Sequence, residues 1–185
     1  MTSSSRLKVS SPQRTSGGLV EILAEARVKR SLELTGSPAE IKTAAIRLLS
    51  YRARSRKELA EKLQLKGFDR RQIEEVIKLL ETAGLINDRA LAADLLRYAV
   101  ERKSLGAKGI RMFLAGRGID RELIDKTMAG HSPESEENAA LGFAEKKLRT
   151  LKKYPPDVVK RKLWGMLQRR GFSSGVIHKT ISSVL

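Results

Sequence analysis

The sequence predicts an all-α protein made of three tandem three-helix modules in an elongated arrangement, preceded by a flexible leader. Three observations support this fold class. Signals that start and end helices are dense, no segment alternates apolar and polar residues over the length of a strand, and one pattern of apolar residues and glycines occurs three times. About nine short helices are therefore expected.

The leader is predicted to be residues 1–36. Up to residue 18 the chain is rich in Ser, Thr and Gly and has few apolar residues, so this part is expected to be disordered. Apolar residues then stand at positions 19, 22, 23 and 26, which is helical spacing. One short helix is therefore expected between Leu19 and Leu34.

Capping boxes mark the helix starts that follow. Ser37-Pro38-Ala39-Glu40 combines a Ser cap, a Pro at the first helical position and a Glu that can reach back to the N–H of the cap residue. Ser55-Arg56-Lys57-Glu58 is a second box, and Asp69-Arg70-Arg71-Gln72 is a third, with Asp as the cap. Asp88 is also expected to act as a helix cap.

Glycines mark the expected helix ends, because glycine adopts the left-handed cap conformation without a Cβ clash. These glycines are Gly67, Gly84, Gly118, Gly130 and Gly171. The pair Pro155-Pro156 separates two further helices. Gly109, in contrast, lies just before Ile110 inside a helical segment, and it is expected to weaken the start of that helix.

The repeat becomes clear when the chain is aligned on Gly67, Gly118 and Gly171, which are 51 and 53 residues apart. A basic residue precedes each glycine, and Phe or Ile follows it. Apolar residues also recur at fixed distances on both sides, four residues apart, as on one helix face. The positions expected in the core are Leu59, Leu63, Ile110, Leu114, Leu163 and Leu167.

Each unit is therefore predicted to be a helix, a second capped helix, a tight glycine corner and a third helix. The predicted modules are residues 37–86, 87–130 and 131–185. A unit of about 50 residues buries little surface alone, so neighbouring modules are expected to stack. Three in a row suit binding along a filament or a groove better than enclosing a small substrate.

The net charge of +16 points to a polyanionic partner. It is spread along the chain, with +3 in residues 1–36, +4 in 37–84, +3 in 85–130 and +6 in 131–185. The absence of cysteine excludes disulfides, thiol catalysis and cysteine-ligated zinc. A secretory signal and a long apolar segment are also absent, so a cytoplasmic protein without membrane contact is expected.

Catalytic and metal-binding patterns do not occur. His131 and His178 are isolated and lack the neighbouring His or carboxylates that a metal site needs. There is no P-loop, dinucleotide-binding glycine loop or nucleophile elbow. We therefore expect no enzyme activity, no cofactor and no metal.

Some stretches go beyond this general pattern. They are Gly84-Leu85-Ile86-Asn87-Asp88-Arg89-Ala90-Leu91-Ala92, Ile110-Arg111-Met112-Phe113-Leu114-Ala115-Gly116-Arg117-Gly118-Ile119 and Lys160-Arg161-Lys162-Leu163-Trp164-Gly165-Met166-Leu167-Gln168-Arg169-Arg170-Gly171-Phe172. Together with Arg54-Ser55-Arg56-Lys57-Glu58-Leu59 and Lys66-Gly67-Phe68, they resemble the RecX family of regulatory proteins over about residues 40–185. The sequence departs from the family at Leu91, where an aromatic residue is common.

The resemblance implies three tandem three-helix modules and a modulator of the RecA recombinase. Such proteins bind RecA, lie in the groove of the RecA–DNA filament and usually inhibit recombination, strand exchange and ATP hydrolysis. They thereby restrain DNA repair and the SOS response to damage. They carry no catalytic residues.

Basic residues are the candidate binding groups. In the third module, Arg161 lies on the face that points away from the apolar stripe, and Lys162 and Arg169 flank that outward face. This arrangement predicts a basic ridge for phosphates or an acidic protein face. Lys57 and Lys108 stand ten residues before their glycines, as Arg161 does. The full candidate set is Arg56, Lys57, Arg102, Lys108, Arg111, Arg117, Lys160, Arg161, Lys162, Arg169 and Arg170. Trp164 is expected to pack at the core boundary rather than stack on a base.

An alternative is an autonomous helical DNA-binding protein or transcription factor, which the basic helices also suit. No single recognition helix stands out, and three similar units differ from a dimeric reader of DNA. We expect a monomer that binds RecA and the RecA–DNA filament and binds DNA only weakly by itself.

Overall fold

The computed structural model describes residues 36–185. Residues 1–35, with the helix predicted between Leu19 and Leu34, lie outside the described part. Residues 36–185 contain nine α-helices and no strand, which confirms the all-α prediction. None of these helices has the length and apolar composition needed to cross a bilayer.

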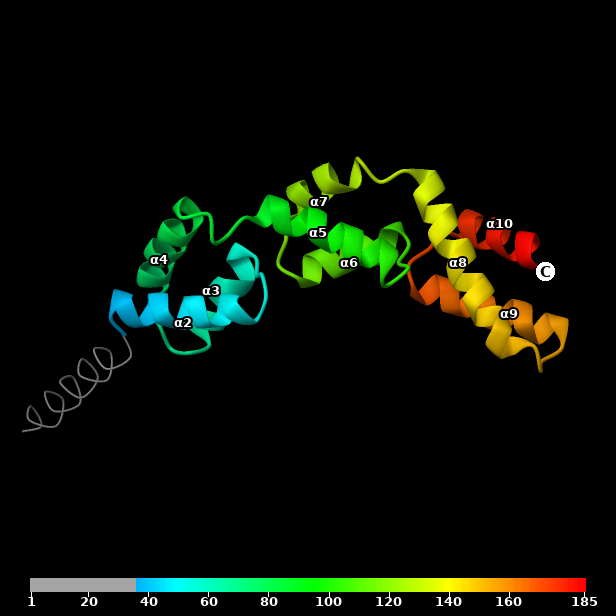
Figure 1. The fold of residues 1–185 in the computed structure, drawn as a ribbon, viewed down its shortest axis with the longest axis horizontal. Coiled ribbons are helices and arrows are strands. Elements are labelled where there is room, and N and C mark those ends of the chain that lie inside the picture. Colours follow the sequence, from blue (N-terminus) through cyan, green and yellow to red (C-terminus); the bar gives the residue numbers. More distant parts are fainter. Residues whose placement is uncertain (1–35) are drawn as a thin grey trace, which may run out of the picture.

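The helices fall into three groups of three. The first module comprises α2 (Pro38–Tyr51), α3 (Arg56–Gln64) and α4 (Arg70–Thr82). The second comprises α5 (Asp88–Glu101), α6 (Ala107–Gly116) and α7 (Arg121–Met128), and the third comprises α8 (Pro133–Leu151), α9 (Pro156–Arg169) and α10 (Ser174–Val184). The modules follow one another in a bowed row, with the first at the left of the view and the C-terminus at the right (Figure 1).

Each module has its own hydrophobic core, and these three cores share no residue. The leucines and isoleucine that precede the three glycine corners are completely buried: Leu59, Leu63, Ile110, Leu114, Leu163 and Leu167. Trp164 is partly buried and packs against the core of the third module, as predicted. The modules are therefore separate small cores, and the contacts between them must hold the row together.

Local signals explain most of the helix starts. Ser37 and Glu40 form the complete capping box, and Asp69 caps α4 by accepting from the N–H groups of Arg71 and Gln72. Two starts differ from the predictions. At α5 the cap is Asn87 rather than Asp88. At α3 the cap is Ser55, as predicted, but the Glu58 carboxylate binds arginines instead of closing the capping box.

The glycine corners have the expected geometry at the repeated positions. Gly67, Gly118 and Gly171 have φ of 89°, 77° and 83°, in the left-handed region that favours glycine. The next residue donates its N–H back into the preceding helix, for example from Ile119 to the Leu114 carbonyl at 3.2 Å. Gly84 is also left-handed, with φ of 72°. Gly130 follows the end of α7 as predicted, but without the expected left-handed conformation, because its φ is not positive.

The start of α9 differs from those of α3 and α6. The latter two begin eleven residues before their corner glycine, but α9 begins fifteen residues before Gly171. Its cap position is Pro155 and its first helical residue is Pro156, so neither residue has an N–H group, and no side chain caps this helix end.

Candidate functional site

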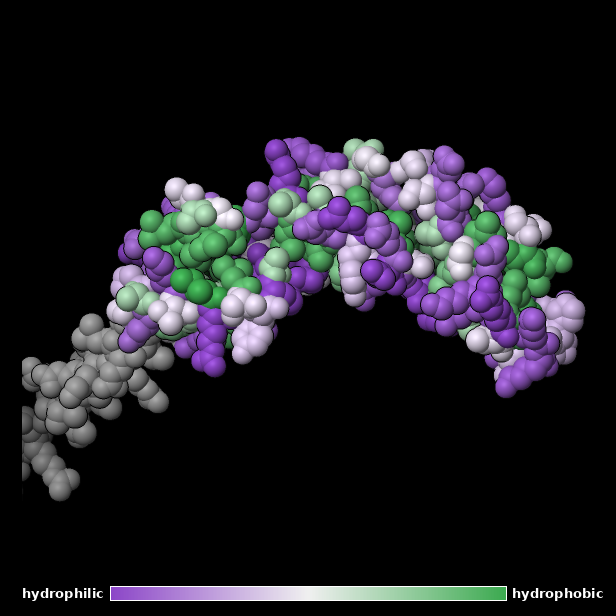
Figure 2. Space-filling model, in the orientation of Figure 1, coloured by the Kyte–Doolittle hydropathy of each residue, from purple (hydrophilic) through white to green (hydrophobic). Residues whose placement is uncertain are grey.

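The second helices of the modules carry the predicted repeating basic position. Lys57 lies in the first turn of α3, Lys108 lies in the first turn of α6, and Arg161 lies in the second turn of α9. All three side chains are exposed, and none forms an ion pair with a carboxylate of residues 36–185. In Figure 1, α6 and α9 lie on the lower, concave side of the bow, where Figure 2 shows many hydrophilic residues.

The other predicted residues divide into two groups. Arg102, Lys160 and Arg169 are exposed and form no ion pair within the described part of the chain, and Lys162 is half-buried with its ammonium group 4.5 Å from the centre of the Tyr154 ring. The second group is already engaged within the protein: Arg56, Arg111, Arg117 and Arg170. This second group binds carboxylates, carbonyls or a ring, so those residues have fewer donors left for a partner.

Arg56 and Arg111 make contacts inside single modules. The Arg56 guanidinium bridges Glu74 and Glu81 on α4, with 2.6 Å to the Glu81 carboxylate. Arg111 pairs with Asp125, which connects α6 to α7. Ion pairs near the surface contribute little stability, so these contacts add little to either module.

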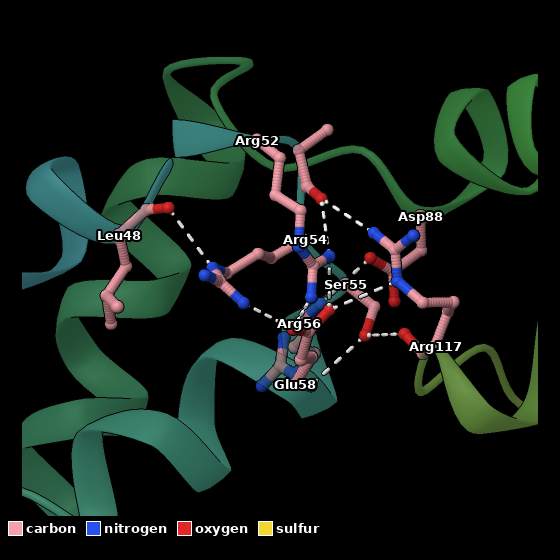
Figure 3. A network of polar contacts seen from close by, with 9 residues as sticks. Leu48, Arg52, Arg54, Ser55, Arg56, Glu58, Asp88 and Arg117 are labelled. Carbon is pink, nitrogen blue, oxygen red and sulfur yellow. Dashed lines mark hydrogen bonds and ion pairs between the residues drawn. The ribbon is translucent and has the colours of Figure 1, made fainter. Parts of the chain in front are cut away.

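Arg117 belongs to the contact between the first and second modules, which we call the first joint. It consists of residues 52–58, which lead into α3 and form its first turn, together with Asp88 and the Arg117-Gly118 corner. The buried Ser55 hydroxyl donates to the Arg117 carbonyl at 2.7 Å, and the Arg117 side chain donates to the Ala53 carbonyl at 3.0 Å. The side chains meet between α3 and the α6–α7 corner (Figure 3).

A carboxylate lies at the centre of the first joint. Arg52, Arg54 and Arg117 surround Glu58, at 3.0 Å from Arg52 Nη1 and 3.5 Å from Arg117 Nε (Figure 3). Burial alone would raise the pKa of Glu58, but the hydrogen bond from Arg52 and the charges of the three arginines together lower that pKa below its ordinary value. Glu58 is therefore ionised and binds arginines of both modules.

Asp88 completes the first joint by accepting from the Arg56 N–H at 2.9 Å. Burial raises the pKa of the Asp88 carboxyl above its ordinary value, and the nearby charges of Glu81 and Asp120 add to this, while the Arg56 N–H opposes it. Asp88 thus satisfies one of the unpaired N–H groups at the start of α3, a group that no residue of its own helix can reach.

The second and third modules meet through a second joint, formed by Gly106 to Gly109, Glu136 and the Arg170-Gly171 corner. The N–H groups of Gly106 and Lys108 donate to the carbonyls of Arg170 and Gly171, at 3.0 and 3.2 Å. A Cβ on Gly109 would overlap the Arg170 carbonyl, and a Cβ on Gly171 would overlap the backbone of Gly109. This contact therefore requires the absence of side chains at both glycines.

The Arg170 side chain makes further contacts between the second and third modules. Its guanidinium lies 4.2 Å from the centre of the Phe143 ring, and it donates to the Lys103 carbonyl. Burial lowers the pKa of Arg170 from its ordinary value. The prediction that Arg170 binds an anion stays open, but its side chain already connects α8 and α9 to the end of α5.

The two joints occupy equivalent positions in the repeat. Ser55 and Gly106 cap the second helices, and the corner of the following module packs against each cap. In the second joint Glu136 accepts from the Ala107 N–H at 2.9 Å, as Asp88 does from Arg56 in the first. The joints were not predicted from the sequence, although the glycines at 106 and 109 were a signal. That Gly109 weakens the start of its helix stays a prediction, and the structure adds that its missing side chain admits the next module.

No group of three or more metal-ligating side chains occurs within residues 36–185. His178 instead packs edge-on against Trp164, with 4.6 Å between the ring centres. The candidate site described here is the set of exposed basic residues on the second helices, with the two joints between the modules that carry them.

Comparison with known proteins assigns this scaffold to a family. Models of the first, second and third three-helix domains of RecX match residues 42–80, 87–128 and 134–181. The chain is 34% identical to the regulatory protein RecX of Corynebacterium efficiens, over 75% of this chain and 68% of the relative, and 38% identical to that of Chlorobaculum tepidum, over 76% and 86%.

Solved structures agree with the sequence comparison. The crystal structure of RecX from Lactobacillus salivarius is similar with a TM-score of 0.68 and 26% identity, over 79% of this chain and 95% of that one. A second crystal structure of regulatory protein RecX gives 0.70 and 27%, over 79% and 73%. These matches show that the chain belongs to the RecX family of regulatory proteins.

Proposed function

We propose that this protein binds RecA, lies in the groove of the RecA–DNA filament and inhibits strand exchange and ATP hydrolysis, thereby restraining DNA repair. The observation that carries the proposal is the exposed basic residue on the second helix of each module: Lys57, Lys108 and Arg161. Repeated charges on a bowed row suit a partner whose negative charge also repeats.

In the proposed mechanism the protein inhibits by binding along the filament groove, not by catalysing a reaction. A chain that binds along the groove contacts successive filament subunits, and it is expected to resist the rearrangements that exchange and hydrolysis require. Charge would bring the protein to the filament, and the joints would keep the basic helices in one line. In this proposal the chain is a cytoplasmic monomer, with no cofactor and no catalytic residue, that binds DNA alone only weakly.

The first test adds the protein in sub-stoichiometric amounts to RecA on single-stranded DNA. We expect slower ATP hydrolysis and less strand exchange. Unchanged rates of both would overturn the proposal, whereas an effect on hydrolysis only would restrict it to one step.

The second test removes the repeated charges. We expect the triple variant Lys57→Ala, Lys108→Ala and Arg161→Ala to lose most of the inhibition and to lower the salt dependence of binding by about two to three phosphate contacts. The matched control replaces Lys78, Arg121 and Lys146, which are equally charged, exposed and located on other helices of the same three modules. Equal loss in both triple variants would show that only net charge matters.

The alternative, an autonomous DNA-binding protein, gives a different result. It requires binding to duplex DNA without RecA, with a preference for one sequence of about 10³-fold or more over random DNA. Such a preference would count against the filament proposal.

A further inference from the structure

The first module has a groove along α2 that no other part of residues 36–185 fills. It has a volume of about 510 Å³ and is lined mainly by apolar surface from α2, with Lys66 of the glycine corner beside it. The α2 residues that line it follow helical spacing and include Ala39, Thr43, Ala44, Arg47, Leu48 and Tyr51. In Figure 2 hydrophobic residues appear on the visible face of the first module over α2 and α4.

The shape of this groove indicates a helical occupant. A lining that repeats every three to four residues along one helix forms a seam into which a second helix packs. Small residues at positions 39, 43 and 44 allow a close approach, and Tyr51, which is 75% exposed, offers a large apolar contact at the far end.

The repeat gives a reason why an occupant is needed. The corners at Gly118 and Gly171 both pack against a preceding module, whereas no module within residues 36–185 precedes the corner of the first module, Lys66-Gly67-Phe68. Gly36, the first described residue, lies so close to this corner that a Cβ there would overlap the Phe68 ring. The described part of the chain therefore begins beside the corner of the first module and the groove.

We propose that residues 19–34 of this chain bind in the groove as a helix antiparallel to α2 and cover the open end of the row. The connection between Leu34 and Pro38 has a length typical of a tight turn between antiparallel helices. A 16-residue helix is about 24 Å long, enough to follow all of α2.

In this arrangement apolar residues of the segment lie at the same height as groove-lining residues of α2. An antiparallel turn at residues 35–37 brings Val20 level with Tyr51 and Leu23 with Leu48, and it brings Ala26 within one residue of the level of Ala44. These positions lie in or beside the apolar stripe of residues 19–26. The apolar end of the segment thus meets the end of the groove that Leu48 and Tyr51 line.

Charges match as well. Arg30 comes within one residue of the level of Glu40, and Glu25 within one residue of the level of Arg47, so opposite charges lie close to each other at both ends. A second copy of this chain is the competing occupant, because Glu40 and Arg47 could also pair reciprocally across a two-fold axis. The tethered segment has the advantage of a millimolar effective concentration.

Cysteine cross-linking distinguishes these occupants, because the full chain contains no cysteine. The variant Ala26→Cys with Ala44→Cys should form an intramolecular disulfide about tenfold faster than the control pair Ala26→Cys with Ala93→Cys, whose second position is exposed on α5. Equal rates in the two pairs would overturn the proposal, and disulfide-linked dimers from the first pair would assign the groove to a second copy.

Charge reversal provides an independent readout in the same full-length protein. Adding Glu25→Arg should slow the intramolecular cross-link severalfold, and adding Arg47→Glu as well should restore it. A cross-link that responds to neither change would overturn the predicted register. Because neither readout involves RecA, failure here leaves the filament proposal intact, and the reverse also holds.

Discussion

The joint between the first and second modules is made mainly by side chains, whereas the joint between the second and third modules is made mainly by backbone atoms. Ser55, Glu58, Asp88 and Arg117 form the first, and the N–H groups and carbonyls around Gly109 and Gly171 form the second. Both joints pack a glycine corner against the start of a second helix. The same geometry is therefore compatible with a contact held mainly by polar side chains and with one held mainly by backbone groups in close packing.

The largest expected effect comes from Gly109→Ala in the second joint. Alanine normally stabilises a helix relative to glycine, but here the Cβ would overlap the Arg170 carbonyl. We expect a loss of about 3 kcal/mol in the stability of the contact between the modules, measured by hydrogen exchange at Gly106 and Lys108.

Gly142→Ala is the matched control, because Gly142 is also in a helix but has open space around its Cβ position. It should stabilise α8 by about 0.5–1 kcal/mol. If Gly109→Ala also stabilised the protein, the steric description of the second joint would be wrong.

The next effect comes from Ser55→Ala in the first joint. The variant loses the cap of α3 and leaves the Arg117 carbonyl without the donor that the buried Ser55 hydroxyl provides, which should cost about 2 kcal/mol in thermal or denaturant unfolding. Ser173→Ala, which removes only an exposed cap from α10, should cost about half as much. Equal costs would show that the contact with Arg117 adds no stability.

A smaller effect is expected from Glu58→Gln, about 1.5 kcal/mol at pH 7, because the arginines of the first joint lose their common anion. The pKa of Glu58 is lowered in the folded protein, so its contribution is present above the ordinary value of 4.5 and is lost as the pH falls through the folded value. Unfolding measured from pH 7 to pH 3 should show this loss in the wild type but not in Glu58→Gln.

The smallest effect, with the opposite sign, is expected from Asp88→Asn. Because the pKa of Asp88 is raised, the folded state binds its proton more tightly, and stability falls as the pH rises from the ordinary value of 3.8 through the folded value. Asparagine can still accept from the Arg56 N–H without the charge, so at pH 7 the variant should equal or exceed the wild type by less than about 1 kcal/mol. A clear loss of stability at pH 7 would show that the ionised form is required.

These contrasts also explain what the sequence could predict. The module cores follow from apolar spacing within about 20 residues, so Leu59, Leu63 and their counterparts were placed correctly. The joints connect residues far apart in the sequence, by 29 positions for Ala107 and Glu136 and by 62 for Ser55 and Arg117, and no local pattern specifies such contacts. For that reason a capping box was predicted for Glu58, and Gly109 was read as a weak helix start.

The candidate surface shows the same limit. Helical spacing was enough to place Lys57, Lys108 and Arg161 on exposed positions of the second helices. It could not separate them from Arg56, Arg117 and Arg170, because ion pairs and carbonyl contacts depend on how the modules and helices meet.

The two prolines at the start of α9 have a consequence for self-assembly. A corner that docks on a helix start is a head-to-tail contact, and repeated between molecules such a contact would produce an open fibre. At α9 the matching N–H groups are missing at Pro155 and Pro156, and the helix begins four residues earlier relative to its glycine than α3 and α6 do. The start of α9 therefore does not offer another molecule's corner the donors that the start of α6 offers in the second joint.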